Sequence, residues 1–230
     1  MSTQPPSAPP PNLQLTEMLK LWDKVDRVEP GDRFIPSLYV QIENFLNADE
    51  VNDLLDYTLV NEHRFEPAKV RVEYESDERK AVVLWRREHF ADVADFMSRR
   101  VHRVLPEVLP KLKVVEFPIS RTEVQMTAFR DGNYFKQHRD NYWQDSRRKL
   151  SFVYYFHRQP KPFTGGELRL YDSMIEDGCY EPAESFKTIE PWHNSIVFFH
   201  SRNAHEVLPI RCPSQQFRDS RFTVNGWLHR

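Results

Sequence analysis

Cysteine is scarce in this chain, which has only Cys179 and Cys212 among its 230 residues. Two cysteines are too few for the disulfide framework of a small secreted domain, so we expect two free thiols in a reducing compartment. No stretch approaches the roughly 18 consecutive apolar residues of a membrane-spanning helix. The first residues, "MSTQPPSAPPPN", contain no Lys, no Arg and no apolar run, unlike a secretory signal peptide. We therefore expect a soluble, cytoplasmic protein with no membrane partner.

The chain also lacks a large excess of either positive or negative residues. The 32 Lys and Arg residues nearly balance the 34 Asp and Glu residues, which leaves a formal net charge of -2. A nucleic-acid-binding protein would carry a strongly basic face, so nucleic acid is not expected as a partner. The sequence gives no signal for the oligomeric state.

The length and the distribution of residue types predict one folded domain with a short unfolded head. The Pro-rich residues 1–12 cannot bury apolar area, so we expect them to be disordered, and a peptide-docking role for them stays open. Residues 13–230 are expected to form a single domain, because nothing in them indicates a second boundary. Within it, helical support is expected over about 13–115 and the catalytic core over about 116–230.

Helical spacing is confined to the first half of the chain. Apolar residues recur at helical intervals over residues 13–28. A second helix is expected after Asn47, where Glu50 three residues later completes a capping box. A third is expected over residues 89–105, ending at Pro106.

Short strand-like segments dominate the second half. Residues 70–85 predict two strands around the polar tip "ESDERK", which is either a mobile lid over a site or an ordinary exposed turn. Further alternating segments are separated by Pro, Gly, Asn and Asp: "RTEVQMTAFR", "KLSFVYYFH", "GELRLYD", "KTIEP", "NSIVFFH" and "RFTVNGWLHR". Many short strands with turns between them favour an antiparallel sandwich or barrel.

The stretch "DGNYFKQHRDNYW" carries the first candidate for chemistry. An extended backbone points residues i and i+2 to the same side, so His138 and Asp140 could grip one metal ion. The pair could also be ordinary polar surface. A third ligand would complete the facial triad of non-haem Fe(II) oxygenases, and "IVFFHSRNAHEVLP" offers His200 and His205.

These residues belong to a set of five motifs that follow one another along the chain. "NYFKQHRDN", "RKLSFVYYFH", "TGGELRLYD", "FFHSRNAHEVLP" and "SRFTVNGWLHR" follow one another between about residues 121 and 230. This stretch resembles the Fe(II)/2-oxoglutarate-dependent dioxygenases, in the prolyl-4-hydroxylase-like branch. The resemblance implies a mainly β fold with supporting helices, built on a double-stranded β-helix, which is a jelly roll of two facing sheets. Gly165 and Gly166 fit the turn before a core strand.

The resemblance also implies which residues hold the metal and the co-substrate. It assigns His138, Asp140 and His205 as iron ligands, with no metal role for His200. Arg221 matches the basic residue that pairs with the distal carboxylate of 2-oxoglutarate, since a guanidinium makes a two-point contact with a carboxylate. Four further residues are weaker candidates for contacting the co-substrate or lining its pocket: Tyr155, Thr223, Tyr134 and Gln125.

The function implied is hydroxylation of an unactivated C–H bond in an amino acid or a peptidyl residue, with release of succinate and CO2. Fe(II), 2-oxoglutarate and O2 are expected, with ascorbate as a supporting reductant. Asp140 favours hydroxylation, because halogenases of this superfamily have a small residue there. Arg139 and Arg86 could pair with a substrate carboxylate or be ordinary surface charges. The alternative function is a non-catalytic jelly-roll module that binds or senses metal and 2-oxoglutarate.

Overall fold

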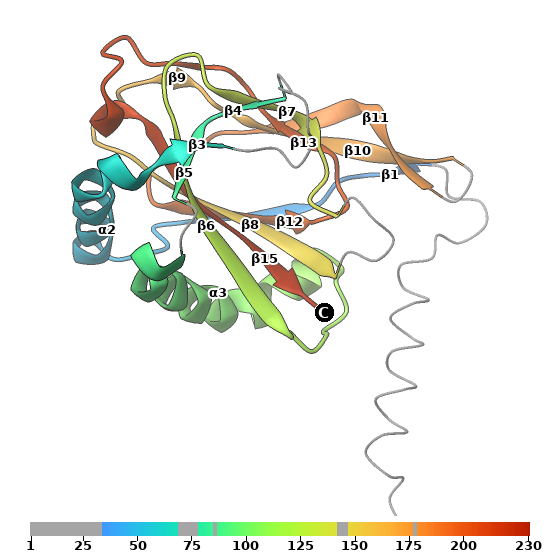
Figure 1. Ribbon diagram of the computed structural model, residues 1–230. Coiled ribbons are helices and arrows are strands. Elements are labelled where there is room, and N and C mark those ends of the chain that lie inside the picture. The colour runs from blue at the N-terminus through green and yellow to red at the C-terminus, as the bar shows by residue number, and fades with distance from the viewer. Residues whose placement is uncertain (1–33, 69–77, 85–86, 142–146, 177–178) are drawn as a thin grey trace, which may run out of the picture.

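The protein is described by a computed structural model that covers residues 34–68, 78–84, 87–141, 147–176 and 179–230 (Figure 1). The Pro-rich head, the helix expected over 13–28, and the first strand of the hairpin expected over 70–85 lie outside the described residues. So do Arg86 and the side chain of Cys179. Cys212 is a buried free thiol, as expected.

Two α-helices occur in the described part of the chain, α2 (Ala48–Val60) and α3 (Ala91–Lys111). The predicted capping box is present at α2, where Asn47 and Glu50 each accept the other's backbone N–H. Single 3-10 turns form η1 (Glu62–Arg64), η2 (Arg87–His89) and η3 (Phe217–Asp219). Neither α-helix is long and apolar enough to cross a bilayer.

The predicted end of the third helix was wrong. We expected it to stop at Pro106, yet α3 continues through Pro106 and Pro110 to Lys111. A proline inside a helix removes one hydrogen bond and crowds the preceding turn. Both prolines are exposed, whereas Leu105, Val108 and Leu109 are buried against the sheet. Packing of this apolar stripe offsets the local cost, because most helical stability in proteins comes from such burial.

Within the described residues, fifteen strands build two facing antiparallel sheets and one short ribbon. The larger sheet has the order β2-β12-β8-β15-β6-β5-β3, and the smaller has β1-β10-β13-β7-β4 with β11 also paired to β10. The ribbon pairs β14 with β9. The strands are β1 (Phe34–Ile35), β2 (Tyr39–Glu43), β3 (Glu66–Pro67), β4 (Arg79–Lys80), β5 (Val82–Leu84), β6 (Arg121–Phe129), β7 (Tyr134–His138), β8 (Arg148–Phe156), β9 (Thr164–Gly165), β10 (Leu168–Glu176), β11 (Cys179–Ile189), β12 (Ser195–His200), β13 (His205–Val207), β14 (Ile210–Arg211) and β15 (Arg221–His229).

The helices cover the face of the larger sheet that is turned away from the smaller sheet (Figure 1). Alternation along β15 divides its side chains between the two faces. Phe222 and Val224 join the main apolar core with residues of α2 and α3. Arg221 and Asn225 instead line a cavity between the sheets. The expected mainly β, jelly-roll architecture with supporting helices is confirmed.

The strand expected after the hairpin tip is divided between the two sheets. β4 pairs with β7 in the smaller sheet, while β5 pairs with β6 in the larger one. Ala81 lies between them and is buried. The chain therefore crosses from one sheet to the other at this point, and Arg79 on β4 is brought to the edge of the space between the sheets.

Candidate active site

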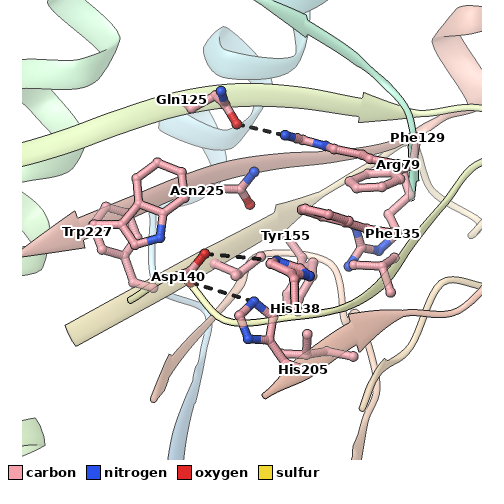
Figure 2. Close-up of a pocket in the computed structure, with 15 residues that line it drawn as sticks. Arg79, Gln125, Phe129, Phe135, His138, Asp140, Tyr155, His205, Asn225 and Trp227 are labelled. Carbon is pink, nitrogen blue, oxygen red and sulfur yellow. Dashed lines mark hydrogen bonds and ion pairs between the residues drawn. The ribbon is translucent and has the colours of Figure 1, made fainter. Parts of the chain in front are cut away.

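The ends of two paired strands bring three potential metal ligands together. His138 is the last residue of β7, and His205, the first residue of β13, lies opposite it in the strand register. The ligand atoms of these two residues and of Asp140 lie within 4.8 Å of one another. His138 Nε2 is 3.9 Å from Asp140 Oδ1, and His205 Nε2 is 3.6 Å from Asp140 Oδ2 (Figure 2). Two nitrogens and one carboxylate therefore converge on one point.

Backbone carbonyls fix the orientation of both imidazoles. His138 Nδ1 lies 2.8 Å from the carbonyl oxygen of Lys136, and His205 Nδ1 lies 3.0 Å from that of Asn203. Because a carbonyl oxygen only accepts, each Nδ1 carries the proton and each Nε2 keeps its lone pair. Burial, followed by the nearby His205, lowers the pKa of His138 to about 3. This imidazole is therefore neutral near pH 7, as a metal ligand must be.

The Asp140 carboxylate is held ionised. Burial raises its pKa, but His205, His138 and hydrogen bonds from Ser151 and Trp227 outweigh that effect, so the pKa falls below its ordinary value. The Ser151 hydroxyl donates to Asp140 Oδ2 at 2.6 Å. Such hydrogen bonds orient a carboxylate for metal binding.

His200, the other histidine of the same motif, lies elsewhere. It ends β12, and its Nε2 is 2.9 Å from the carbonyl oxygen of Leu112, which follows α3. The structure therefore places His205, and not His200, beside the other two ligands.

A buried cation occupies another part of the same cavity. The Arg221 side chain is 1% exposed, and its Cζ lies 5.0 Å from the ring centre of Phe129 and 4.8 Å from that of Tyr155. Arg221 Nε and Nη1, the Tyr155 hydroxyl and the Thr223 hydroxyl are all buried without a hydrogen-bond partner. Burial lowers the pKa of Arg221 and raises that of Tyr155. Buried polar groups are normally paired, so this cluster of donors fits an anion such as a carboxylate.

The glycine pair before β10 makes room for this cation. Gly165 and Gly166 both have φ of +75°, the left-handed conformation that favours glycine. A Cβ atom on Gly166 would lie 2.7 Å from Arg221 Cδ and 2.8 Å from Ile210 Cγ1. The turn predicted here therefore also sets the position of the Arg221 side chain.

Known proteins match the chain in both sequence and fold. The family model described as "2OG-Fe(II) oxygenase superfamily" matches residues 124–229, which span the triad and Arg221. Over these residues the chain is similar to this superfamily. Its prolyl-hydroxylase-like branch is supported by an uncharacterized PKHD-type hydroxylase from Synechocystis sp., which is 35% identical over 198 residues. That alignment covers 86% of the present chain and 65% of the relative, so the chain spans less than two thirds of the relative's length.

Two solved prolyl hydroxylases share the fold of this chain. A Pseudomonas putida prolyl-4-hydroxylase aligns with a TM-score of 0.56 and 22% identity, covering 84% of this chain and 93% of its own. A Trichoplax adhaerens prolyl hydroxylase, solved with a hypoxia inducible factor oxygen degradation domain peptide fragment, aligns with a TM-score of 0.62 and 18% identity. That alignment covers 94% of this chain and 92% of the other.

The cavity between the sheets collects most, but not all, of the residues that the sequence singled out. Its empty space, mouth and adjoining solvent included, is about 490 Å³. Thr223 and Tyr134 are not among the lining residues: Thr223 lies buried on the cavity-facing side of β15, while Phe135 takes the lining position next to Tyr134 on β7. The lining residues are Arg79, Gln125, Phe129, Phe135, His138, Asp140, Phe152, Val153, Tyr155, Leu168, His205, Val207, Arg221, Asn225 and Trp227.

Sequence reasoning missed Arg79. It belongs to the charged tip "ESDERK", and nothing in the sequence separates it from an exposed turn residue. In the structure Arg79 Nη2 donates to Thr127 Oγ1 at 3.2 Å and to Gln125 Oε1 at 3.4 Å. Arg139, which the sequence had offered for a substrate carboxylate, instead forms an ion pair with Glu181 at 3.1 Å.

Proposed function

We propose that this chain is an Fe(II)- and 2-oxoglutarate-dependent dioxygenase that hydroxylates an unactivated C–H bond of an amino acid or peptidyl residue. Succinate and CO2 are the other products. The observation that carries the proposal is one cavity that contains both the converging His138, Asp140 and His205 side chains and the buried, unsatisfied guanidinium of Arg221.

The donor set fits Fe(II). Two neutral imidazoles and one carboxylate on one face of an octahedral ion leave three positions for other ligands. His138, Asp140 and His205 would hold the ion, which when bound supplies the O2 chemistry that oxidises a C–H bond. Ser151 holds the carboxylate, and the carbonyls of Lys136 and Asn203 hold the two rings. The ligands are therefore oriented before the metal arrives.

The buried hydrogen-bond donors around Arg221 fit 2-oxoglutarate. Arg221 would bind the distal carboxylate through two N–H groups, and the Tyr155 and Thr223 hydroxyls would add hydrogen bonds to the same anion. All of these atoms are buried and lack partners in the described part of the chain. A bound carboxylate would satisfy them together and would orient the co-substrate's other end toward the triad.

The substrate class is supported by relatives. The Synechocystis relative is named a PKHD-type hydroxylase, and the Trichoplax adhaerens enzyme was solved with a peptide fragment. These names favour a prolyl-type or other aliphatic position, in a free amino acid or within a peptide. Phe135 and Trp227 line the cavity and would give such a side chain an apolar surface.

Turnover of 2-oxoglutarate tests the proposal. The protein is loaded anaerobically with Fe(II) and 2-oxoglutarate and then exposed to air, with succinate measured by mass spectrometry. Candidate amino acids and cell-extract peptides are searched in parallel for a +16 Da product. We expect succinate formation that is lost in Asp140→Ala. If the protein binds both ligands but forms no succinate, with or without candidates, it is a non-catalytic binding or sensing module.

A further inference from the structure

The proposed chemistry leaves one cation of the cavity without a partner of opposite charge. Arg79 Nη2 contacts Gln125 and Thr127, which are both neutral, and Arg79 Nε is buried without a hydrogen-bond partner. Figure 2 shows the guanidinium inside the cavity, hydrogen-bonded to Gln125 on β6. Among the described residues, no carboxylate forms an ion pair with it. Arg79 is therefore held in place by neutral groups and still has donors to offer.

The charge of Arg79 is retained at neutral pH. Burial lowers its pKa to about 10, and the field of Asp140 opposes that shift. The Asp140 carboxylate acts on Arg79 only through its field and forms no ion pair with it, and in the proposed function its charge faces the metal ion held with His138 and His205. The Arg79 side chain is partly buried and its Nε is fully buried. A desolvated cationic donor without a counterion is unfavourable, so this part of the cavity should attract an anion.

Arg79 and Arg221 lie against different rings. The Arg79 guanidinium carbon lies 4.8 Å from the ring centre of Phe135, and that ring stacks on His138 with 3.5 Å between ring centres. Arg221 lies against Phe129 and Tyr155 instead. One anion held by Arg221 therefore leaves Arg79 available for a second, beside the metal ligands.

We propose that Arg79 is a substrate-binding residue that recognises a carboxylate carried by the substrate. This inference rests on the proposed function, in which the two carboxylates of 2-oxoglutarate are already taken by the metal and by Arg221. The unpaired Arg79 Nε can donate to a carboxylate, and the hydrogen bonds from Nη2 to Gln125 and Thr127 fix the orientation of the guanidinium. The carboxylate can belong to a free amino acid, or to an acidic side chain of a peptide.

Matched pairs of probes that differ only in carboxylate against amide test this inference. L-proline is compared with L-prolinamide, and acetyl-Pro-Glu-amide with acetyl-Pro-Gln-amide. Each is titrated anaerobically into protein saturated with Fe(II) and 2-oxoglutarate, and binding is followed by the change in the visible absorbance of that complex. In wild type we expect at least one carboxylate probe to bind more tightly than its amide, by about tenfold or more. The reason is that only the carboxylate can form a charge-assisted hydrogen bond with Arg79.

Variants of β4 supply the controls. Arg79→Gln should abolish the preference for carboxylate while 2-oxoglutarate affinity stays unchanged, and Arg79→Lys should retain part of it. Lys80→Gln, which removes the exposed neighbouring cation, should keep the full preference. The probe pair that shows the preference identifies the source of the carboxylate. As a readout that needs no iron, the same probe should raise the melting temperature of metal-free wild type but not of Arg79→Gln.

Two results would overturn the inference. One is a wild-type protein that binds neither carboxylate more tightly than its amide. The other is a preference that survives in Arg79→Gln, which would mean that the carboxylate coordinates the metal or contacts another cation. Failure of the proposed function is distinct, because it would appear as a protein that forms no succinate from 2-oxoglutarate, whether or not the Fe(II) and 2-oxoglutarate complex gives its absorbance band.

Discussion

Residues only five positions apart have different surroundings at this site. His200 and His205 both belong to the motif "FFHSRNAHEVLP", and both are histidines at strand ends. His205 lies opposite His138 in the register, whereas His200 reaches the carbonyl of Leu112. Their roles should therefore separate sharply on substitution.

His205→Ala should lose Fe(II) binding, whereas His200→Ala should keep it. Outer partners of metal ligands typically contribute about 10–100-fold in affinity, so loss of a ligand should exceed that range. Equilibrium dialysis of Fe(II) under anaerobic conditions measures both variants against wild type. The opposite pattern, with iron lost in His200→Ala and kept in His205→Ala, would show that the ligand assignment is wrong.

Arg221→Leu should weaken 2-oxoglutarate binding while Fe(II) binding is largely kept. Loss of a buried charge-assisted pair costs about 2–5 kcal/mol, which corresponds to about 30-fold or more in affinity. Arg221→Lys should recover only part, because an ammonium lacks the planar two-point contact. Anaerobic titration of the Fe(II)-loaded proteins by visible absorbance gives the affinities. Unchanged affinity in Arg221→Leu would mean that another residue binds the co-substrate.

At the scale of elements, local sequence rules and tertiary packing compete in α3. The helix contains Pro106 and Pro110, yet its buried stripe continues past both. Helix propensity is a weak prior, and an amphipathic face packed on a sheet overrides it. The helix should therefore be strained at its exposed prolines rather than stabilised by them.

Pro106→Ala should stabilise the protein. Alanine restores an N–H donor for the His102 carbonyl and removes the ring's clash, together worth about 3 kcal/mol in a helix interior. Release of the unfolded chain from the proline constraint subtracts about 0.4–1 kcal/mol, so a net gain of about 2 kcal/mol is expected. Urea unfolding measures it, with Glu107→Ala at an exposed neighbouring position as the control. A loss of stability in Pro106→Ala would contradict this account.

At the scale of the whole molecule, folding buries the imidazoles of His157 and His205. His157, just after β8, is 2% exposed and packs near His193 and Phe163. Burial is the main reason that its pKa falls to about 4. The folded state therefore favours the neutral ring, while the unfolded chain takes up a proton near pH 6.5.

Stability of the metal-free protein should fall as the pH falls from about 6.5 to 4. In that window the unfolded state binds more protons than the folded state, so protonation favours unfolding. A depressed histidine pKa of this size contributes on the order of 2–3 kcal/mol. His157→Gln should reduce, but not remove, the pH dependence of urea unfolding, because His138 also has a lowered pKa. His63→Gln, at an exposed position, should leave it unchanged. An equally steep dependence in His157→Gln would assign the effect to other groups.

Particular residues show how far sequence reasoning reached. The Asn47–Glu50 capping box and the alternation of Arg221 against Phe222 follow from local geometry, and both are present. The end of α3 was mispredicted, because its packing partners lie on other elements. Arg79 was missed, because its role depends on β4 joining β7 while β5 joins β6. No pattern within "ESDERK" encodes that crossing.

The sequence by itself determined the periodicity of the strands, the supporting helices and the ordered motifs, because side-chain spacing and turn chemistry act over a few residues. The tertiary structure decided which histidine faces Asp140 and which guanidiniums enter the cavity. Those outcomes depend on strand register and on the closure of two sheets, which join residues as distant as Arg79, His138 and Arg221. Burial then keeps the His138 imidazole neutral, since desolvation arises only when the folded chain encloses the ring.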